Sequence, residues 1–194
     1  GKLLLLSMIS GFGTTAIAAN AVANTVAMIA VLPGMAVGYG IVSVISQCVG
    51  SGDYEQVRYY GRKLIKWVYL LMGIVDILII LLIPVIIDLY GLSEATGDLA
   101  GKIILFHNIC AIVIWPISFS LPNVLRAASD VMYTMIIGVG SMWVFRILSG
   151  YLLGSVLGMG VFGVWVAMII DWVVRSICFL IRYHGGKWKH PAVR

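Results

Sequence analysis

Charged residues are scarce in this sequence. Only 11% of its 194 residues are Asp, Glu, Lys or Arg, whereas 61% are hydrophobic. Soluble domains carry about 25% charged and roughly 45–50% apolar residues. The 13 basic residues are spread along the whole chain and are too dilute for the basic patch of a nucleic-acid-binding protein. The composition therefore argues against a soluble enzyme and against a nucleic-acid partner.

Cysteine pairs and catalytic motifs are missing as well. Cys48, Cys110 and Cys178 lie far apart in apolar sequence, with no metal-binding spacing, so we expect buried apolar side chains. Residues 158–163 spell G-x-G-x-x-G, but they join two apolar stretches rather than a strand and a helix. The sequence predicts no enzymatic activity, no cofactor and no metal site.

Long charge-free runs dominate instead. Residues 3–52 carry no charge, residues 67–87 only Asp76, and residues 131–170 only Arg146. A membrane-spanning helix needs about 20 apolar residues. The chain is therefore predicted to be all-α, a polytopic membrane helical bundle of about six transmembrane helices. The expected spans are 1–11 (truncated), 16–49, 57–88, 98–127, 131–157 and 161–182, with kinks at Pro33, Pro116 and Pro122.

The remaining charges alternate from loop to loop. One side carries the basic residues Arg58, Arg62, Lys63, Lys66, Arg126, Arg182, Lys187, Lys189 and Arg194. The opposite loops carry Asp88, Glu94, Asp98 and Lys102. By the positive-inside rule, the basic side and the C-terminus are predicted to be cytoplasmic.

Three ionisable residues fall inside predicted spans: Asp76, Arg146 and Asp171. Each lies roughly 15–18 Å from the outer end of its span, near the bilayer midplane, where isolated charges are costly. We expect Arg146 to pair with Asp171, with Asp76 as a second partner and Arg175 as an alternative partner for Asp171. Such a pair would either lock adjacent helices or respond to a proton or ion during transport.

Uncharged polar and aromatic side chains within the spans are candidates for a substrate cavity. Each polar group needs a hydrogen-bond partner on another helix or a water-filled cavity, and each apolar group could equally be ordinary packing. The candidates are Asn20, Asn24, Met28, Gln47, Trp115, Phe119 and Asn123. His107 is expected to be neutral and hydrogen-bonded, with a proton relay as the alternative.

Several segments resemble the multidrug and toxic compound extrusion (MATE) family. They are residues 18–24 (AANAVAN), 32–38 (LPGMAVG), 47–56 with the turn Gly50-Ser51-Gly52-Asp53, 125–130, 143–146, 163–167 and 171–172. The resemblance covers nearly the whole chain. It implies that residues 1–194 form the C-terminal six-helix lobe of a twelve-helix, two-lobe transporter, as a fragment without the N-terminal lobe.

The resemblance also implies an activity. Such transporters exchange Na⁺ or H⁺ for cationic or amphipathic drugs by alternating access, in a bacterial-type plasma (inner) membrane. The expected partners are drug-like small molecules, membrane lipids and the N-terminal lobe. Alternatives are a flippase for lipid-linked precursors, which should have a cationic cavity, and a membrane scaffold without a transport cycle.

Overall fold

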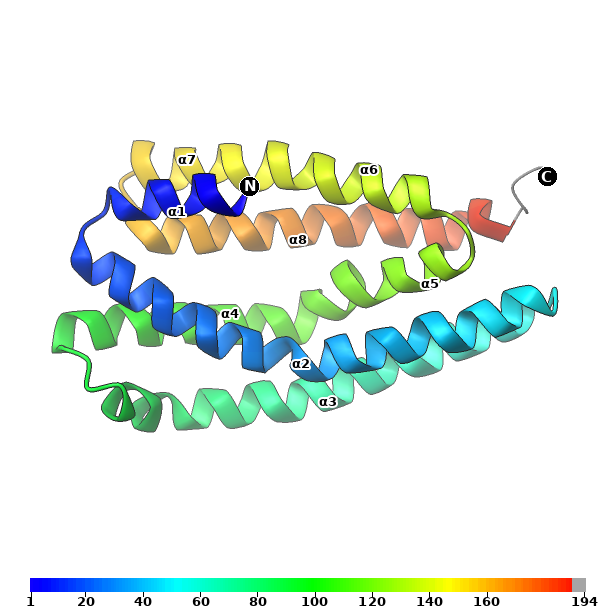
Figure 1. The fold of residues 1–194 in the computed structure, drawn as a ribbon, viewed down its shortest axis with the longest axis horizontal. Coiled ribbons are helices and arrows are strands. Elements are labelled where there is room, and N and C mark those ends of the chain that lie inside the picture. Colours follow the sequence, from blue (N-terminus) through cyan, green and yellow to red (C-terminus); the bar gives the residue numbers. More distant parts are fainter. Residues whose placement is uncertain (190–194) are drawn as a thin grey trace.

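The computed structural model describes residues 1–189, which fold into helices joined by short turns (Figure 1). In chain order these are α1 (Lys2–Ser10), α2 (Thr14–Gly50), α3 (Tyr54–Leu89), α4 (Glu94–Trp115), η1 (Pro116–Ser120), α5 (Leu121–Ala127), α6 (Val131–Ser141), η2 (Met142–Leu148), α7 (Ser149–Tyr151), η3 (Leu152–Val156), α8 (Gly160–Gly185) and η4 (Lys187–Lys189). No strand occurs within residues 1–189.

Five helical segments are long and apolar enough to cross a membrane. They are Thr14–Gly50, Tyr54–Leu89, Glu94–Ala127, Val131–Val156 and Gly160–Gly185. The short helix α1, with 9 residues, precedes them. The prediction of about six membrane helices, the first one short, is thereby confirmed.

The turns between spans follow local rules. Asp53 caps α3, because its side chain accepts hydrogen bonds from the backbone N–H groups of Glu55 and Gln56. The link before α8 contains Gly158 and Gly160 with φ of +71° and +62°, a region that glycine adopts without strain. This tight link makes the last two spans antiparallel neighbours, as the sequence predicted.

Two of the predicted kink positions, Pro33 and Pro116, change the direction or the winding of their helices without breaking them. The long helix α2, which contains Pro33, bends near its middle (Figure 1). Pro116 begins the π-helical segment η1, which continues into α5 without leaving the helical path. Two further π-helical segments, η2 and η3, lie in the fifth span, where the sequence has no proline.

The bundle has two groups of helices. Figure 1 shows α6, α7 and α8 along one edge and α2, α3 and α4 along the other, while α4 packs against both α3 and α8. Glycines allow the closest approaches, since a Cβ on Gly163 would lie 2.7 Å from the backbone carbon of Leu153. Gly150 and Gly154, four residues apart, face Ala167 and Val164 on α8, so these small residues bring the last two spans together.

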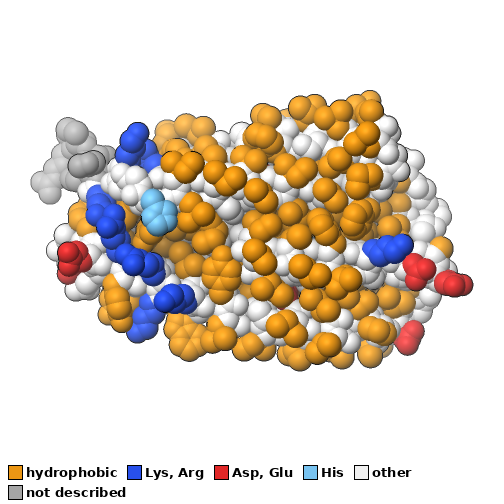
Figure 2. Space-filling model, turned by 180° about the vertical axis from the view of Figure 1, so that it is seen from behind, with side chains coloured by type: hydrophobic (Ala, Val, Ile, Leu, Met, Phe, Trp, Pro, Cys, Tyr) orange, Lys and Arg blue, Asp and Glu red, His pale blue; other side chains and the backbone are white. Residues whose placement is uncertain are grey.

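The surface has an apolar middle and charged ends. Figure 2 shows hydrophobic side chains across the central surface, mainly Lys and Arg at one end with an acidic side chain beside them, and mainly Asp and Glu at the other end with a basic side chain beside them. A soluble protein rarely exposes so large an apolar patch, whereas lipid tails would cover it. Residue 194, one of the predicted basic tail positions, lies outside the described residues.

Candidate substrate cavity and midplane charges

A cavity of about 240 Å³ opens between α1, α2, η2 and α8. Its walls include three of the predicted cavity residues, Asn20, Asn24 and Met28, and one predicted midplane charge, Arg146. The two asparagines lie four residues apart on α2 and therefore share one face of the helix. The cavity thus joins residues that are more than 100 positions apart in the sequence.

A hydrogen bond orients one wall of this cavity. The indole N–H of Trp165 donates to Oδ1 of Asn20 over 3.0 Å, and both side chains are buried. Trp165 also packs edge-on against His107, with 5.5 Å between ring centroids. His107 Nδ1 lies 2.9 Å from Oδ1 of Asn108. The hydrogen-bonded histidine that the sequence predicted is therefore present. His107 does not line the cavity itself, but it packs against Trp165, which does.

Trp115 and Phe119 lie elsewhere. Their rings stack with centroids 5.1 Å apart, and Trp115 is buried where a Cβ on Gly34 would strike it. Phe119 lines a separate cavity of about 360 Å³ together with Arg126 and Arg175. These two aromatic residues pack between helices and do not line the cavity that contains Asn20.

Gln47 and Asn123 are also outside that cavity. Gln47 is exposed near the end of α2. Asn123 is half-buried on α5, and its amide nitrogen packs against Gly38, where a Cβ would lie only 2.8 Å from it. Of the seven predicted cavity residues, three therefore line one cavity and Phe119 lines another, whereas Trp115, Gln47 and Asn123 line neither.

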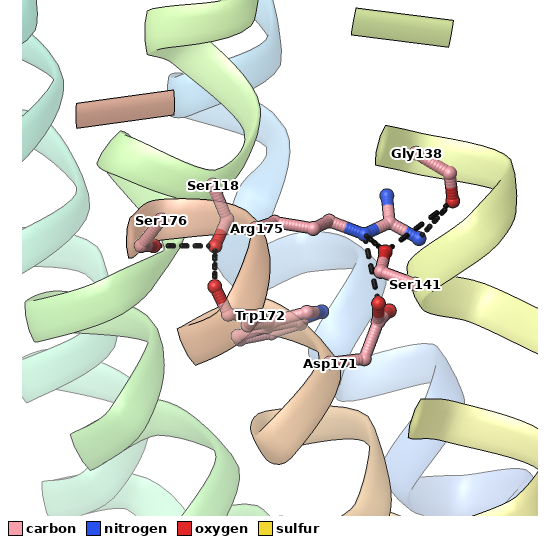
Figure 3. Close-up of polar contacts among 7 residues, drawn as sticks. All are labelled: Ser118, Gly138, Ser141, Asp171, Trp172, Arg175 and Ser176. Carbon is pink, nitrogen blue, oxygen red and sulfur yellow. Dashed lines mark hydrogen bonds and ion pairs between the residues drawn. The ribbon is translucent and has the colours of Figure 1, made fainter. Parts of the chain in front are cut away.

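The ion pair of Asp171 is not the one that we expected first. Arg175 Nε lies 2.9 Å from Asp171 Oδ1, one turn away on α8 (Figure 3). The same Nε donates to Ser141 Oγ, and another guanidinium nitrogen donates to the carbonyl of Gly138, each over 2.9 Å. Arg175, rather than Arg146, pairs with Asp171. Two acceptors on α6, Ser141 and Gly138, hold the guanidinium of Arg175 beside this carboxylate.

Arg146 therefore has no ion pair within residues 1–189. It lies in the π-helical segment η2, is half-buried, and its Nε is buried with no hydrogen-bond partner in the described chain. Its guanidinium is one of the polar groups of the cavity.

Asp76 is also unpaired. Its side chain is completely buried on α3, and neither carboxylate oxygen has a hydrogen-bond partner in the described part of the chain. Contacts of Ile87 with Gly97 and a hydrogen bond from Tyr69 to the carbonyl of Val113 set the antiparallel register of α3 and α4. This register places Asp76 level with Asn108, whose amide nitrogen likewise has no partner there.

Other polar contacts escaped the sequence interpretation. Ser118 and Ser176 share a 2.7 Å hydrogen bond between η1 and α8. Asp130 accepts two hydrogen bonds from Arg182, of 2.6 and 3.0 Å, at the basic end. No sequence spacing links these distant positions. In residues 1–189 no group of His, Cys, Asp and Glu is arranged to hold a metal ion.

Comparison with known proteins connects this geometry to a family. The sequence profile of the MatE family matches residues 1–152. The chain is 25% identical over 189 residues to the uncharacterized transporter YisQ of Bacillus subtilis, a match that covers 96% of this chain and 41% of that protein. It is 26% identical over 199 residues to the probable multidrug resistance protein NorM of Thermotoga maritima, covering 100% of this chain and 41% of NorM. The chain thus spans about two fifths of the length of these relatives.

A solved structure has the same fold. It is the crystal structure of MATE in complex with MaL6, which superposes with a TM-score of 0.80 at 20% identity and covers 100% of this chain and 44% of that one. One lobe of a two-lobe transporter accounts for such a share. Because the family profile covers most of the residues and the bundle has this fold, the chain belongs to the MatE family of membrane transporters.

Proposed function

We propose that this chain is the C-terminal lobe of a secondary active exporter, which exchanges Na⁺ or H⁺ for cationic or amphipathic small molecules by alternating access. The observation that carries the proposal is the cavity lined by Asn20, Asn24, Met28 and Arg146 inside a bundle of the MatE family. Transporter sites typically lie near the midplane between helices. The N-terminal lobe would supply the opposite wall of the transport pathway.

Asp76 is the carboxylate that we assign to ion coupling. Asp171 is neutralised by Arg175, whereas Asp76 is fully buried with no cation beside it in the described residues. A bare carboxylate in this apolar setting is costly, so it favours a bound proton or Na⁺. Binding and release of that ion would then couple to the packing of α3 against α4.

Efflux from vesicles tests both statements. The full-length protein, reconstituted with a fluorescent cationic dye inside, is energised by a Na⁺ gradient or by a pH gradient applied separately. We expect one gradient to drive efflux and Asp76→Asn to abolish that dependence. Asp88→Asn, a change at an exposed position in the last turn of α3, is the matched control. Efflux that needs neither gradient, or gradient-driven efflux by Asp76→Asn, would contradict the coupling assignment.

We further propose a bacterial plasma membrane location with the C-terminus in the cytoplasm. The basic residues at one end of the bundle and the acidic residues at the other support this orientation (Figure 2). A protein that moves no dye in either gradient but scrambles lipid-linked pyrophosphates would instead be a flippase. Absence of both activities would favour a scaffold.

A further inference from the structure

We infer that the cavity between α1, α2, η2 and α8 binds an acidic group, so that its ligands are amphipathic molecules with a carboxylate or phosphate attached to an apolar body. The inference rests on the proposed function and narrows it, because it assigns this cavity to acidic amphipathic ligands rather than to cationic ones. It rests on which polar groups the cavity contains and on how each is already engaged.

The charged groups of this cavity are donors only, and its exposed amide, Asn24, offers a donor and an acceptor. The guanidinium of Arg146 has donors only, and no ion pair or hydrogen bond engages it within residues 1–189. Asn20 accepts from Trp165 through its oxygen, so the amide nitrogen is the end left for a ligand. Lys2 on α1 adds a second cationic side chain to the lining.

The positive charges of Arg146 and Lys2 are not balanced by a carboxylate in the cavity lining, since none of the described residues that line the cavity carries one. The nearest acidic group along α8, Asp171, pairs with Arg175 through Oδ1 and acts on Arg146 only at a distance, without an ion pair. Asp76 lies on α3, which does not line the cavity. His107 stands behind Trp165 and is bonded to Asn108. A half-buried guanidinium without an ion pair is costly, and an anionic ligand would lower that cost.

The other side chains of the cavity lining are apolar and suit an apolar ring or alkyl chain of a ligand. Leu5, Ile9, Met28, Val164 and Met168 are apolar, and Trp165 offers an aromatic face. The volume of about 240 Å³ is below the roughly 300–1,000 Å³ that encloses a drug-sized ligand. The cavity therefore fits the acidic end of a larger molecule, whose remainder would extend toward the other lobe.

Three probes of one shape separate charge from apolar contact. They are 2-naphthoate (anionic), 2-naphthamide (neutral) and 2-naphthylmethylammonium (cationic), each titrated calorimetrically into the full-length protein in phosphatidylcholine nanodiscs. We expect 2-naphthoate to bind at least about tenfold more tightly than 2-naphthamide, because a charge-assisted hydrogen bond replaces a neutral one. Equal affinity for the three probes would overturn the inference.

Matched variants test which residues of the cavity cause the preference for 2-naphthoate. Arg146→Gln should remove the preference for 2-naphthoate, Arg146→Lys should keep part of it, and Asn20→Asp should abolish it, because the new carboxylate repels an anionic ligand. Lys63→Gln removes one positive charge from an exposed position on the basic end and should leave the preference unchanged. If Arg146→Gln does not fold, Asn20→Asp serves as the test of the inference, because it hardly changes the shape of the side chain. A preference for 2-naphthoate that survives in the folded variants Arg146→Gln or Asn20→Asp contradicts the assignment.

The acidic group could belong to a lipid or to a soluble compound. Nanodiscs that contain phosphatidylglycerol should weaken 2-naphthoate binding to the unaltered protein, but not to Arg146→Gln, if a lipid headgroup enters the cavity. Unchanged affinity in those discs assigns the cavity to soluble amphipathic acids. These titrations do not depend on transport. A preference for 2-naphthoate in a protein that shows no dye efflux would refute only the proposed exporter function. Dye efflux by a protein without this preference would refute only the present inference.

Discussion

Arg175 holds Asp171 at 2.9 Å within α8 and thereby leaves Arg146, on the neighbouring helical segment η2, without an ion pair in the described chain. Two arginines face this part of the bundle, but only one is neutralised. The paired arginine joins α8 to α6 through Ser141 and Gly138, whereas the unpaired one lines a cavity. The two arginines should therefore respond differently to substitution.

The first prediction concerns that difference. Arg175→Gln should destabilise the protein by about 3–5 kcal/mol, because it leaves the fully buried Asp171 carboxylate uncompensated. Arg146→Gln breaks no ion pair and should cost much less. Thermal unfolding of the detergent-solubilised protein measures both. The double change Asp171→Leu with Arg175→Met should recover most of the loss, and equal destabilisation by the two single arginine variants would show that Arg146 also shares the carboxylate.

The second prediction concerns the hydrogen bond between Trp165 and Asn20. Asn20→Leu leaves the buried indole N–H without its acceptor and should cost about 1–3 kcal/mol. Asn24→Leu, at an exposed position one turn away, should cost little. A double-mutant cycle with Trp165→Phe isolates the pair, because the second substitution should cost less once the first is made. Strict additivity would mean that the hydrogen bond contributes nothing measurable.

The third prediction concerns close helix packing. A methyl group added in Gly163→Ala would lie 2.7 Å from the backbone carbon of Leu153, so a helix must move and stability should fall by about 1–3 kcal/mol. Gly140→Ala is the control, since nothing lies within 4 Å of its added Cβ. That variant should be neutral or slightly stabilised, because alanine favours the helix. Equal melting temperatures would argue against the tight contact between the last two spans.

The fourth prediction concerns orientation. In a background without Cys48, Cys110 and Cys178, Glu94→Cys should react with a membrane-impermeant maleimide on intact cells, while Lys187→Cys should react only after permeabilisation. The separation of basic and acidic ends is the physical reason (Figure 2). The reverse labelling pattern would invert the topology.

Much of the fold was predictable because the membrane simplifies the problem. Charge-free runs longer than about 20 residues already predict helices, and proline and glycine mark their bends and links. The π-helical segments η2 and η3 were not predictable, since residues 142–156 contain no proline that would mark them. Of the site, the polarity of Asn20, Asn24 and Arg146 was visible in the sequence, but not that they share one cavity.

The sequence by itself determined a membrane helical bundle, its span boundaries and its charged ends, because the low dielectric of lipid acts on each segment independently. The tertiary structure alone decided which polar groups meet. Arg146 and Arg175 were both candidate partners for Asp171, and depth in the membrane could not choose between them. Arg175 pairs with it because Ser141 and Gly138 on α6 complete the coordination of its guanidinium (Figure 3). Such a choice depends on side chains brought together from different helices, which no periodicity along one helix records.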